Sequence, residues 1–217
     1  MRKWIIGIYH FLFPILVAAL YILLLYILFP SSIFYRVGGI LVLYLIPPAG
    51  KESMVPAAVY LLKDAYGMAS IFIASTLISM VDILVAWWVS WNWELAKKIP
   101  LIGTYISRIE KIGKKKWREH RIMRKFVYLG LAVFVAVPFQ GSGGLTATVI
   151  GRILGLEEYK VLFSIAMGAI VGCIFIAVGA YFAIFTLGEG GFLTLGGIII
   201  FISVIWVIYK WLKGEEE

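Results

Sequence analysis

Residues 37–62 read VGGILVLYLIPPAGKESMVPAAVYLL, and this stretch decides the expected fold. Two short apolar runs, at residues 37–46 and 54–62, flank a polar segment that contains two prolines and a glycine. Ten helical residues are about 15 Å long, half of a hydrocarbon core of about 30 Å. The stretch therefore predicts a re-entrant hairpin over residues 33–66. Irregular backbone at that depth is tolerated only where protein or a water-filled cavity surrounds it.

The composition of the whole chain supports a membrane environment. Of 217 residues, 62% are hydrophobic and only 15% are charged. A soluble domain is about half apolar and a quarter charged, and one of this size could not bury so much apolar surface. A soluble enzyme is therefore not expected, and a disordered chain is excluded. We expect an all-α integral membrane protein with full spans at residues 4–29, 68–93, 161–187 and 192–212, the last two joined by a tight turn at residues 188–191.

A second broken stretch predicts a second re-entrant hairpin, over residues 126–156. Its break reads PFQGSGG at residues 138–144. An offset of 90 residues aligns Pro48 with Pro138 and Ala57 with Ala147, and each hairpin precedes a full span. This order predicts an inverted repeat, which is typical of secondary transporters with a binding site at the membrane midplane. Chance similarity of proline-interrupted segments is the alternative explanation.

The positive charge of the chain is concentrated in one segment. Residues 94–126 carry eleven Lys or Arg and three Glu, which accounts for the whole net charge of +8. Such an excess between apolar blocks is typical of a cytoplasmic loop and not of a nucleic-acid-binding protein. We expect residues 94–125 to form an amphipathic helix on the inner leaflet. Both termini are then cytoplasmic, and the protein lies in the cell (plasma) membrane.

Lys51 and Glu52 are the strongest candidates for a functional site. Both are ionisable and stand at the predicted tip of the first hairpin, where charge is costly unless paired or functional. Glu52 could bind a proton or cation, and Lys51 could bind an anionic headgroup or phosphate. The alternatives are a tip that reaches water and a purely structural ion pair.

The tip of the second hairpin carries the small and polar residues Gln140, Gly141, Ser142 and Gly143. Glycines let backbone N–H groups approach a ligand, and the helix that follows would direct its N-terminus at this loop, as the first hairpin does through Ser53. The two tips together would form a polar site. A flexible turn that permits close helix packing is the alternative.

Two further charges interrupt apolar segments. Asp82 lies in the middle of a predicted span, where it could relay a proton, pair with Arg152 or cap a broken helix. Arg152 could instead extend to the inner interface beside Glu157. Four prolines are expected to be structural breaks: Pro47, Pro48, Pro56 and Pro138. Pro56 is expected in the first turn of its helix, where a missing N–H costs little.

No residues in the chain form a recognisable catalytic or metal-binding set. Cys173 is the single cysteine, and His10 and His120 are far apart in the sequence. We therefore expect no enzymatic activity, no metal and no cofactor.

The loop sequences GKESMVP, at residues 50–56, and PFQGSG, at residues 138–143, resemble the two signature loops of the small multidrug export protein family. The stretch 138–181 is also similar to the DedA/VTT membrane protein superfamily, through Gly151, Gly155 and Phe163. The resemblance covers about residues 33–187. It implies paired re-entrant helices and a role in membrane homeostasis, with phospholipids or polyprenyl phosphates as substrates. The family label implies small cationic drugs.

These observations predict a secondary transporter or lipid flippase, coupled to a proton or another ion. Membrane lipids and the coupling ion are the expected partners, and a homo-oligomer is left open. A non-transporting membrane scaffold or assembly factor is the alternative. An ion or water channel is the weakest of the three, because no ring of repeated polar residues is visible.

Overall fold

The protein is all-helical in the part of the chain that the structure describes. The structure is a computed structural model and describes residues 2–46, 49–97, 123–139 and 142–213. Every element in these ranges is a helix, which confirms the predicted all-α class. The basic segment that we expect to be amphipathic lies mostly outside the described residues.

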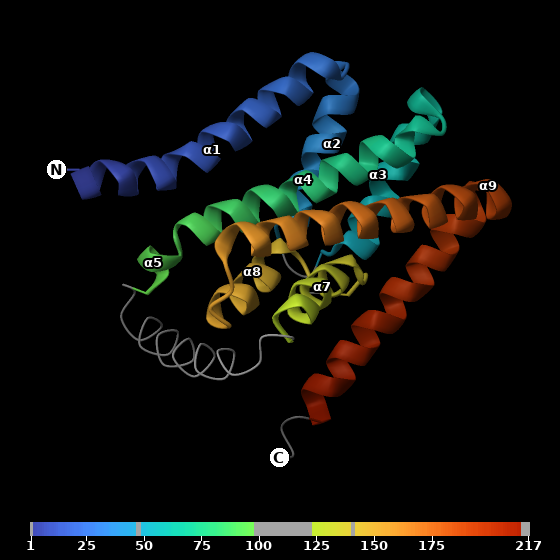
Figure 1. Ribbon diagram of the computed structural model, residues 1–217. Coiled ribbons are helices and arrows are strands. Elements are labelled where there is room, and N and C mark those ends of the chain that lie inside the picture. The colour runs from blue at the N-terminus through green and yellow to red at the C-terminus, as the bar shows by residue number, and fades with distance from the viewer. Residues whose placement is uncertain (1, 47–48, 98–122, 140–141, 214–217) are drawn as a thin grey trace.

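Three helices are long and apolar enough to cross a membrane. They lie within α1 (Arg2–Leu28), α4 (Ala69–Trp91) and the first part of α9 (Glu158–Lys213). α4 lies between α1 and α9 (Figure 1). Many large apolar side chains on these helices are exposed, as expected for helices that face lipid. The prediction of a helical membrane protein is thereby supported.

Four shorter helices form two pairs. The first pair is α2 (Ser31–Tyr44) and α3 (Lys51–Tyr66), and the second pair is α7 (Met123–Ala136) and α8 (Gly144–Ile153). With 10 to 16 residues each, these helices are about 15–24 Å long, shorter than a hydrocarbon core. A one-turn helix, α5 (Trp93–Ala96), follows α4.

Each helix pair has an apolar core of its own, which it shares with α4 and α9. Val55, Val59 and Leu62 of α3 are fully buried in one cluster, together with residues of α4 and α9. Val135 of α7 and Ala147 of α8 are fully buried in the other. α4 and α9 therefore pass through both halves and connect them.

The second pair packs very closely on α9 because α9 carries glycines at the contact. A Cβ built on Gly168 or on Gly172 would overlap the backbone of Ala132 or of Ala136, respectively. The two contacts repeat every four residues on both helices, which is the small-residue spacing of close helix packing in membranes. The separation of α7 and α9 thus depends on these two glycines.

A proline in α1 creates the hydrogen bond that joins α1 to the end of α4. Pro14 has no N–H, so the His10 carbonyl, four residues earlier, has no helical donor. The Asn92 Nδ2 group donates to this carbonyl at 3.1 Å and to the Trp88 carbonyl at 2.8 Å. Aromatic rings pack beside the joint, with the His10 and Trp91 ring centroids 4.8 Å apart.

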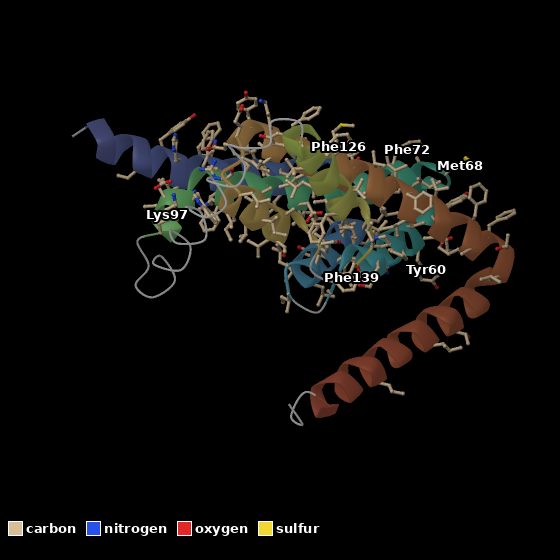
Figure 2. The ribbon with its side chains drawn as sticks, turned by 60° about the horizontal axis from the view of Figure 1, so that its bottom comes forward. Tyr60, Met68, Phe72, Lys97, Phe126 and Phe139 are labelled. Carbon is tan, nitrogen blue, oxygen red and sulfur yellow. The ribbon has the colours of Figure 1, made fainter. Side chains whose placement is uncertain are left out.

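α9 changes direction at a single residue. Gly188 has φ 68° and ψ 171°, a conformation that glycine adopts at little cost. The tight turn expected at residues 188–191 is thus a one-residue break, and the expected span 192–212 is the second part of α9. In Figures 1 and 2 this part stands apart from the other helices.

Gly168→Ala should destabilise the protein by about 1–3 kcal/mol, because its methyl group would press on the Ala132 carbonyl. The matched control is Gly179→Ala on the same helix, where a Cβ meets nothing within 4 Å. There alanine favours the helix by about 1 kcal/mol, so stability should stay equal or rise. The stability of both variants can be measured by thermal unfolding in detergent, with dye labelling of the buried Cys173 thiol as the signal of unfolding. Equal effects would contradict close packing of α7 on α9.

Candidate functional site

A buried ion pair occupies the centre of the molecule. The Lys51 Nζ atom lies 3.0 Å from Asp82 Oδ2, and the two residues are only 2% and 4% exposed. Lys51 is the first residue of α3, and Asp82 lies in the middle of α4. Two charges are costly to desolvate, so such a pair persists only with good geometry and further hydrogen bonds.

The second carboxylate oxygen of Asp82 accepts two hydrogen bonds. Asp82 Oδ1 accepts a hydrogen bond from the Tyr44 hydroxyl at 2.8 Å and from the Gly144 backbone N–H at 2.9 Å. Gly144 is the first residue of α8, so the carboxylate sits at a helix N-terminus, where the helix dipole stabilises negative charge. Asp82 thus caps α8, which is one of the roles considered from the sequence.

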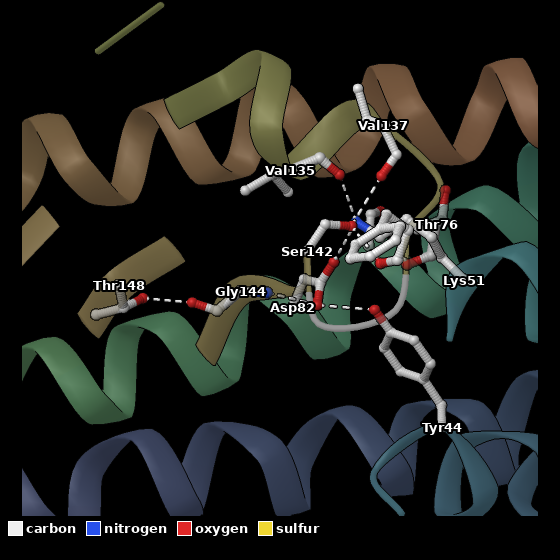
Figure 3. Close-up of polar contacts among 11 residues, drawn as sticks. Tyr44, Lys51, Thr76, Asp82, Val135, Val137, Ser142, Gly144 and Thr148 are labelled. Carbon is white, nitrogen blue, oxygen red and sulfur yellow. Dashed lines mark hydrogen bonds and ion pairs between the residues drawn. The ribbon is translucent and has the colours of Figure 1, made fainter. Parts of the chain in front are cut away.

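Lys51 extends the network to the remaining short helix. Its Nζ atom donates to the Val135 carbonyl at 2.7 Å, near the C-terminus of α7 (Figure 3). Tyr44, Lys51, Val135 and Gly144 come from α2, α3, α7 and α8 in turn. The inner ends of all four short helices therefore meet at the Lys51–Asp82 pair.

The close approach of α8 to α4 requires glycine. A Cβ on Gly144 would overlap the Asp82 carbonyl group, and one on Gly143 would lie 3.2 Å from Asp82 Oδ1. Thr148 donates its hydroxyl hydrogen to the Gly144 carbonyl at 2.6 Å, within the first turns of α8. The two glycines at the start of α8 thus allow close approach to the backbone and the carboxylate of Asp82.

Glu52 lies beside the ion pair in sequence but does not join it. A side chain at Gly50 would overlap the Glu52 carboxylate, which folds back over the start of α3. Glu52 Oε2 is buried and has no hydrogen-bond partner among the described residues. A buried oxygen without a hydrogen bond is costly, so Glu52 Oε2 is a polar atom that the described residues leave unsatisfied.

The two predicted site serines stabilise the tips of the helix pairs. Ser53 Oγ lies 3.0 Å from the Gly50 carbonyl and 3.4 Å from the Gly50 nitrogen, at the start of α3. Ser142 Oγ lies 2.8 Å from the carbonyls of both Val137 and Phe139, between α7 and α8. Both hydroxyls are positioned to hold turns.

One alternative considered for Asp82 is not observed, and the expected position of Pro56 is wrong. Asp82 does not pair with Arg152: Arg152 lies in the last turn of α8, eight residues or about 12 Å beyond Gly144, and its Nη1 is 3.6 Å from Glu158 Oε2. Pro56 is not in the first turn of its helix, because α3 begins at Lys51 and Pro56 is its sixth residue. The Glu52 carbonyl therefore lacks its helical donor.

Four predicted residues cannot be placed in the network. Gln140, Gly141, Pro47 and Pro48 lie outside the described residues. Pro138 lies between α7 and α8, at the break that it was expected to make. Within the described part of the chain, no group of three His, Cys, Asp or Glu side chains could hold a metal ion.

Sequence reasoning identified Lys51 and Asp82 as separate candidates, but it did not pair them, and it missed Tyr44 and the Val135 carbonyl. Lys51 and Asp82 are 31 residues apart, so no helical spacing connects them. The signal available was electrostatic: two opposite charges interrupt apolar segments, and each needs a partner at the same depth. A backbone carbonyl such as that of Val135 has no sequence signature.

The chain matches a known family over most of the elements that build this network. The sequence profile of the family described as "putative small multi-drug export protein" matches residues 53–175, more than half of the chain. The chain belongs to this family. No curated protein and no solved structure matches it.

The match to the small multi-drug export family covers most of the network. It includes Asp82, Val135 and Gly144, whereas Tyr44 and Lys51 precede its first residue by nine and two residues. Membership of this family, together with three helices apolar enough to span a bilayer, indicates a membrane transporter.

Neutralising one member of the pair should strongly destabilise the protein. Asp82→Asn leaves the Lys51 ammonium buried without a counter-charge, and we expect a loss of about 3–5 kcal/mol. The matched control is Asp64→Asn, because Asp64 is 84% exposed in its pair with Lys63 and contributes at most about 1 kcal/mol. Exposure of Cys173 to a thiol-reactive dye during heating reports unfolding.

A double substitution tests whether the two charges act as a pair. Lys51→Met in the Asp82→Asn background removes the ammonium that has lost its counter-charge. The stability loss of the double variant should therefore be smaller than the sum of the two single losses, by about 1–3 kcal/mol. Strict additivity of the two losses would show that Lys51 and Asp82 do not interact in the membrane.

Proposed function

We propose that the protein is a secondary transporter in which the two helix pairs act as re-entrant hairpins around the Lys51–Asp82 pair. The observation that carries this proposal is that one carboxylate and one ammonium contact the inner ends of all four short helices. Short helices that meet near the middle of a spanning helix are the arrangement of transporters with a midplane site.

The directions of the helices support an inverted repeat. α3 starts at the ion pair and only two residues separate its end from the start of α4, so it runs toward the N-terminal end of α4. α8 starts at the same pair and runs parallel to α4, as the order of Thr76, Asp82, Gly144 and Thr148 in Figure 3 indicates. The bases of the hairpins would then lie on opposite sides of the membrane.

The ion pair suggests how coupling would work. Protonation of Asp82 removes the charge that holds both the Lys51 ammonium and the N-terminus of α8. Lys51 would lose its partner, and the tips of the two hairpins could separate. Glu52, with its unpartnered Oε2, is a second candidate for the coupling proton or cation. The substrate site would then lie between the tips, beside Ser142 and Gly143.

The proposed substrates come from the resemblances noted in the sequence. They are phospholipids or polyprenyl phosphates, as implied by a relationship to the DedA/VTT superfamily that we retain as a proposal, and small cationic drugs, as implied by the family description. We also retain the proposed topology: a cell-membrane protein with both termini and the basic segment 94–126 in the cytoplasm.

Reconstitution into liposomes with an imposed pH gradient tests the transport proposal. A fluorescent phospholipid, a polyprenyl phosphate and a cationic dye are offered in separate assays. We expect one of them to be moved at a rate that depends on the gradient, and Asp82→Asn should abolish this dependence while the control Asp64→Asn preserves it. Glu52→Gln, assayed in parallel, shows whether that carboxylate shares the role.

Two results would contradict the proposal. If folded Asp82→Asn and Glu52→Gln proteins both transport with an unchanged pH dependence, these carboxylates do not couple transport to protons. If the wild-type protein moves none of the three compounds but retains a specific protein partner, the scaffold alternative is favoured.

A further inference from the structure

A groove on the side of the bundle lies outside the ion-pair network. It has a volume of about 150 Å³ and lies between α4 and the first part of α9. Phe72, Met80 and Ile83 of α4 form one wall, and Ile170 and Ile174 of α9 form the other. None of the network residues lines it.

The polar atoms in the groove are already satisfied. Three hydroxyl side chains of α4 contribute to its lining. Ser75 and Thr76 donate to carbonyls four residues earlier in α4, at 2.7 and 2.8 Å, and Ser79 Oγ lies 3.4 Å from the Thr76 carbonyl. No charged residue is among the described lining residues. The groove therefore offers its occupant apolar contacts and no free hydrogen-bond donor, which favours a hydrocarbon.

The surroundings of the groove identify where that hydrocarbon comes from. Both walls belong to helices long and apolar enough to span a membrane. Phe72 and Ile170, at 64% and 40% exposure, open the groove to the outside, and Figure 2 shows Phe72 at the edge of the bundle. The medium beside exposed apolar side chains on a spanning helix is the bilayer interior.

We propose that the groove binds a segment of an acyl chain from a membrane lipid. An apolar cavity of about 150 Å³ accommodates benzene, so the groove holds roughly six carbons of such a chain. The chain would fill the gap between α4 and α9, one helical turn from Asp82, since Ser79 precedes Asp82 by three residues. This inference does not depend on transport, because it concerns a lipid bound at the side of the bundle.

Photo-cross-linking in nanodiscs tests the proposal. The probe is a phosphatidylcholine with a diazirine in the middle of one acyl chain, and mass spectrometry locates the labelled residues. Cross-links should be enriched at groove residues over Phe175, which lies on α9 outside the groove and is 78% exposed. Ile170→Trp should fill the groove and reduce its labelling to the level seen at Phe175. The matched control, Phe175→Trp, should leave groove labelling unchanged.

A second variant guards against misfolding of the first. Thr76 is exposed, so Thr76→Leu narrows the groove from its open edge without disturbing buried residues, and it should also lower groove labelling. Protection of Cys173 from thiol reagents confirms that each variant is folded. Even labelling of all exposed positions, unaffected by Ile170→Trp and Thr76→Leu, would show ordinary surrounding lipid and overturn the proposal. The proposal would also be overturned if no lipid labels the groove because a second copy of the chain covers it.

Discussion

The contact between the Lys51 ammonium and the Asp82 carboxylate determines how the rest of the molecule is arranged. Two opposite charges are buried at the centre of an apolar bundle, and each costs several kcal/mol to remove from water. Tyr44, Val135 and Gly144 offset this cost by completing the hydrogen bonds of the pair. Because these residues lie at the inner ends of α2, α7 and α8, and Lys51 is the first residue of α3, the pair lies where α2 and α7 end and where α3 and α8 begin.

Two sets of glycines allow the close helix contacts around this pair. Asp82 can cap α8 only if the first residue of α8 approaches the α4 backbone, and a Cβ on Gly144 would prevent this. α7, which supplies the Val135 carbonyl to Lys51, packs on α9 where Gly168 and Gly172 leave room for its backbone. Small residues in this protein therefore set the distance between helices so that a few polar groups can meet.

The sequence predicted those parts of the structure that depend on local pattern. Apolar runs predicted the long helices, and the proline–glycine breaks at residues 47–53 and 138–144 predicted where the short helices end. It did not predict the partner of Asp82, because a contact across 31 residues depends on how helices pack and not on periodicity. Lys51 and Asp82 were both identified as candidates, but Tyr44 was not, since a tyrosine in an apolar stretch is usual near membranes.

The order of synthesis gives the buried pair a consequence for insertion into the membrane. Lys51 leaves the ribosome 31 residues before Asp82 and 84 residues before Val135. At about 5–20 residues per second, Lys51 waits for seconds without either partner. A lone ammonium is not stable in hydrocarbon. In the proposed re-entrant arrangement, the first helix pair would therefore stay at the membrane surface or within the insertion machinery until α4 is made, and it would reach its final depth once α7 arrives.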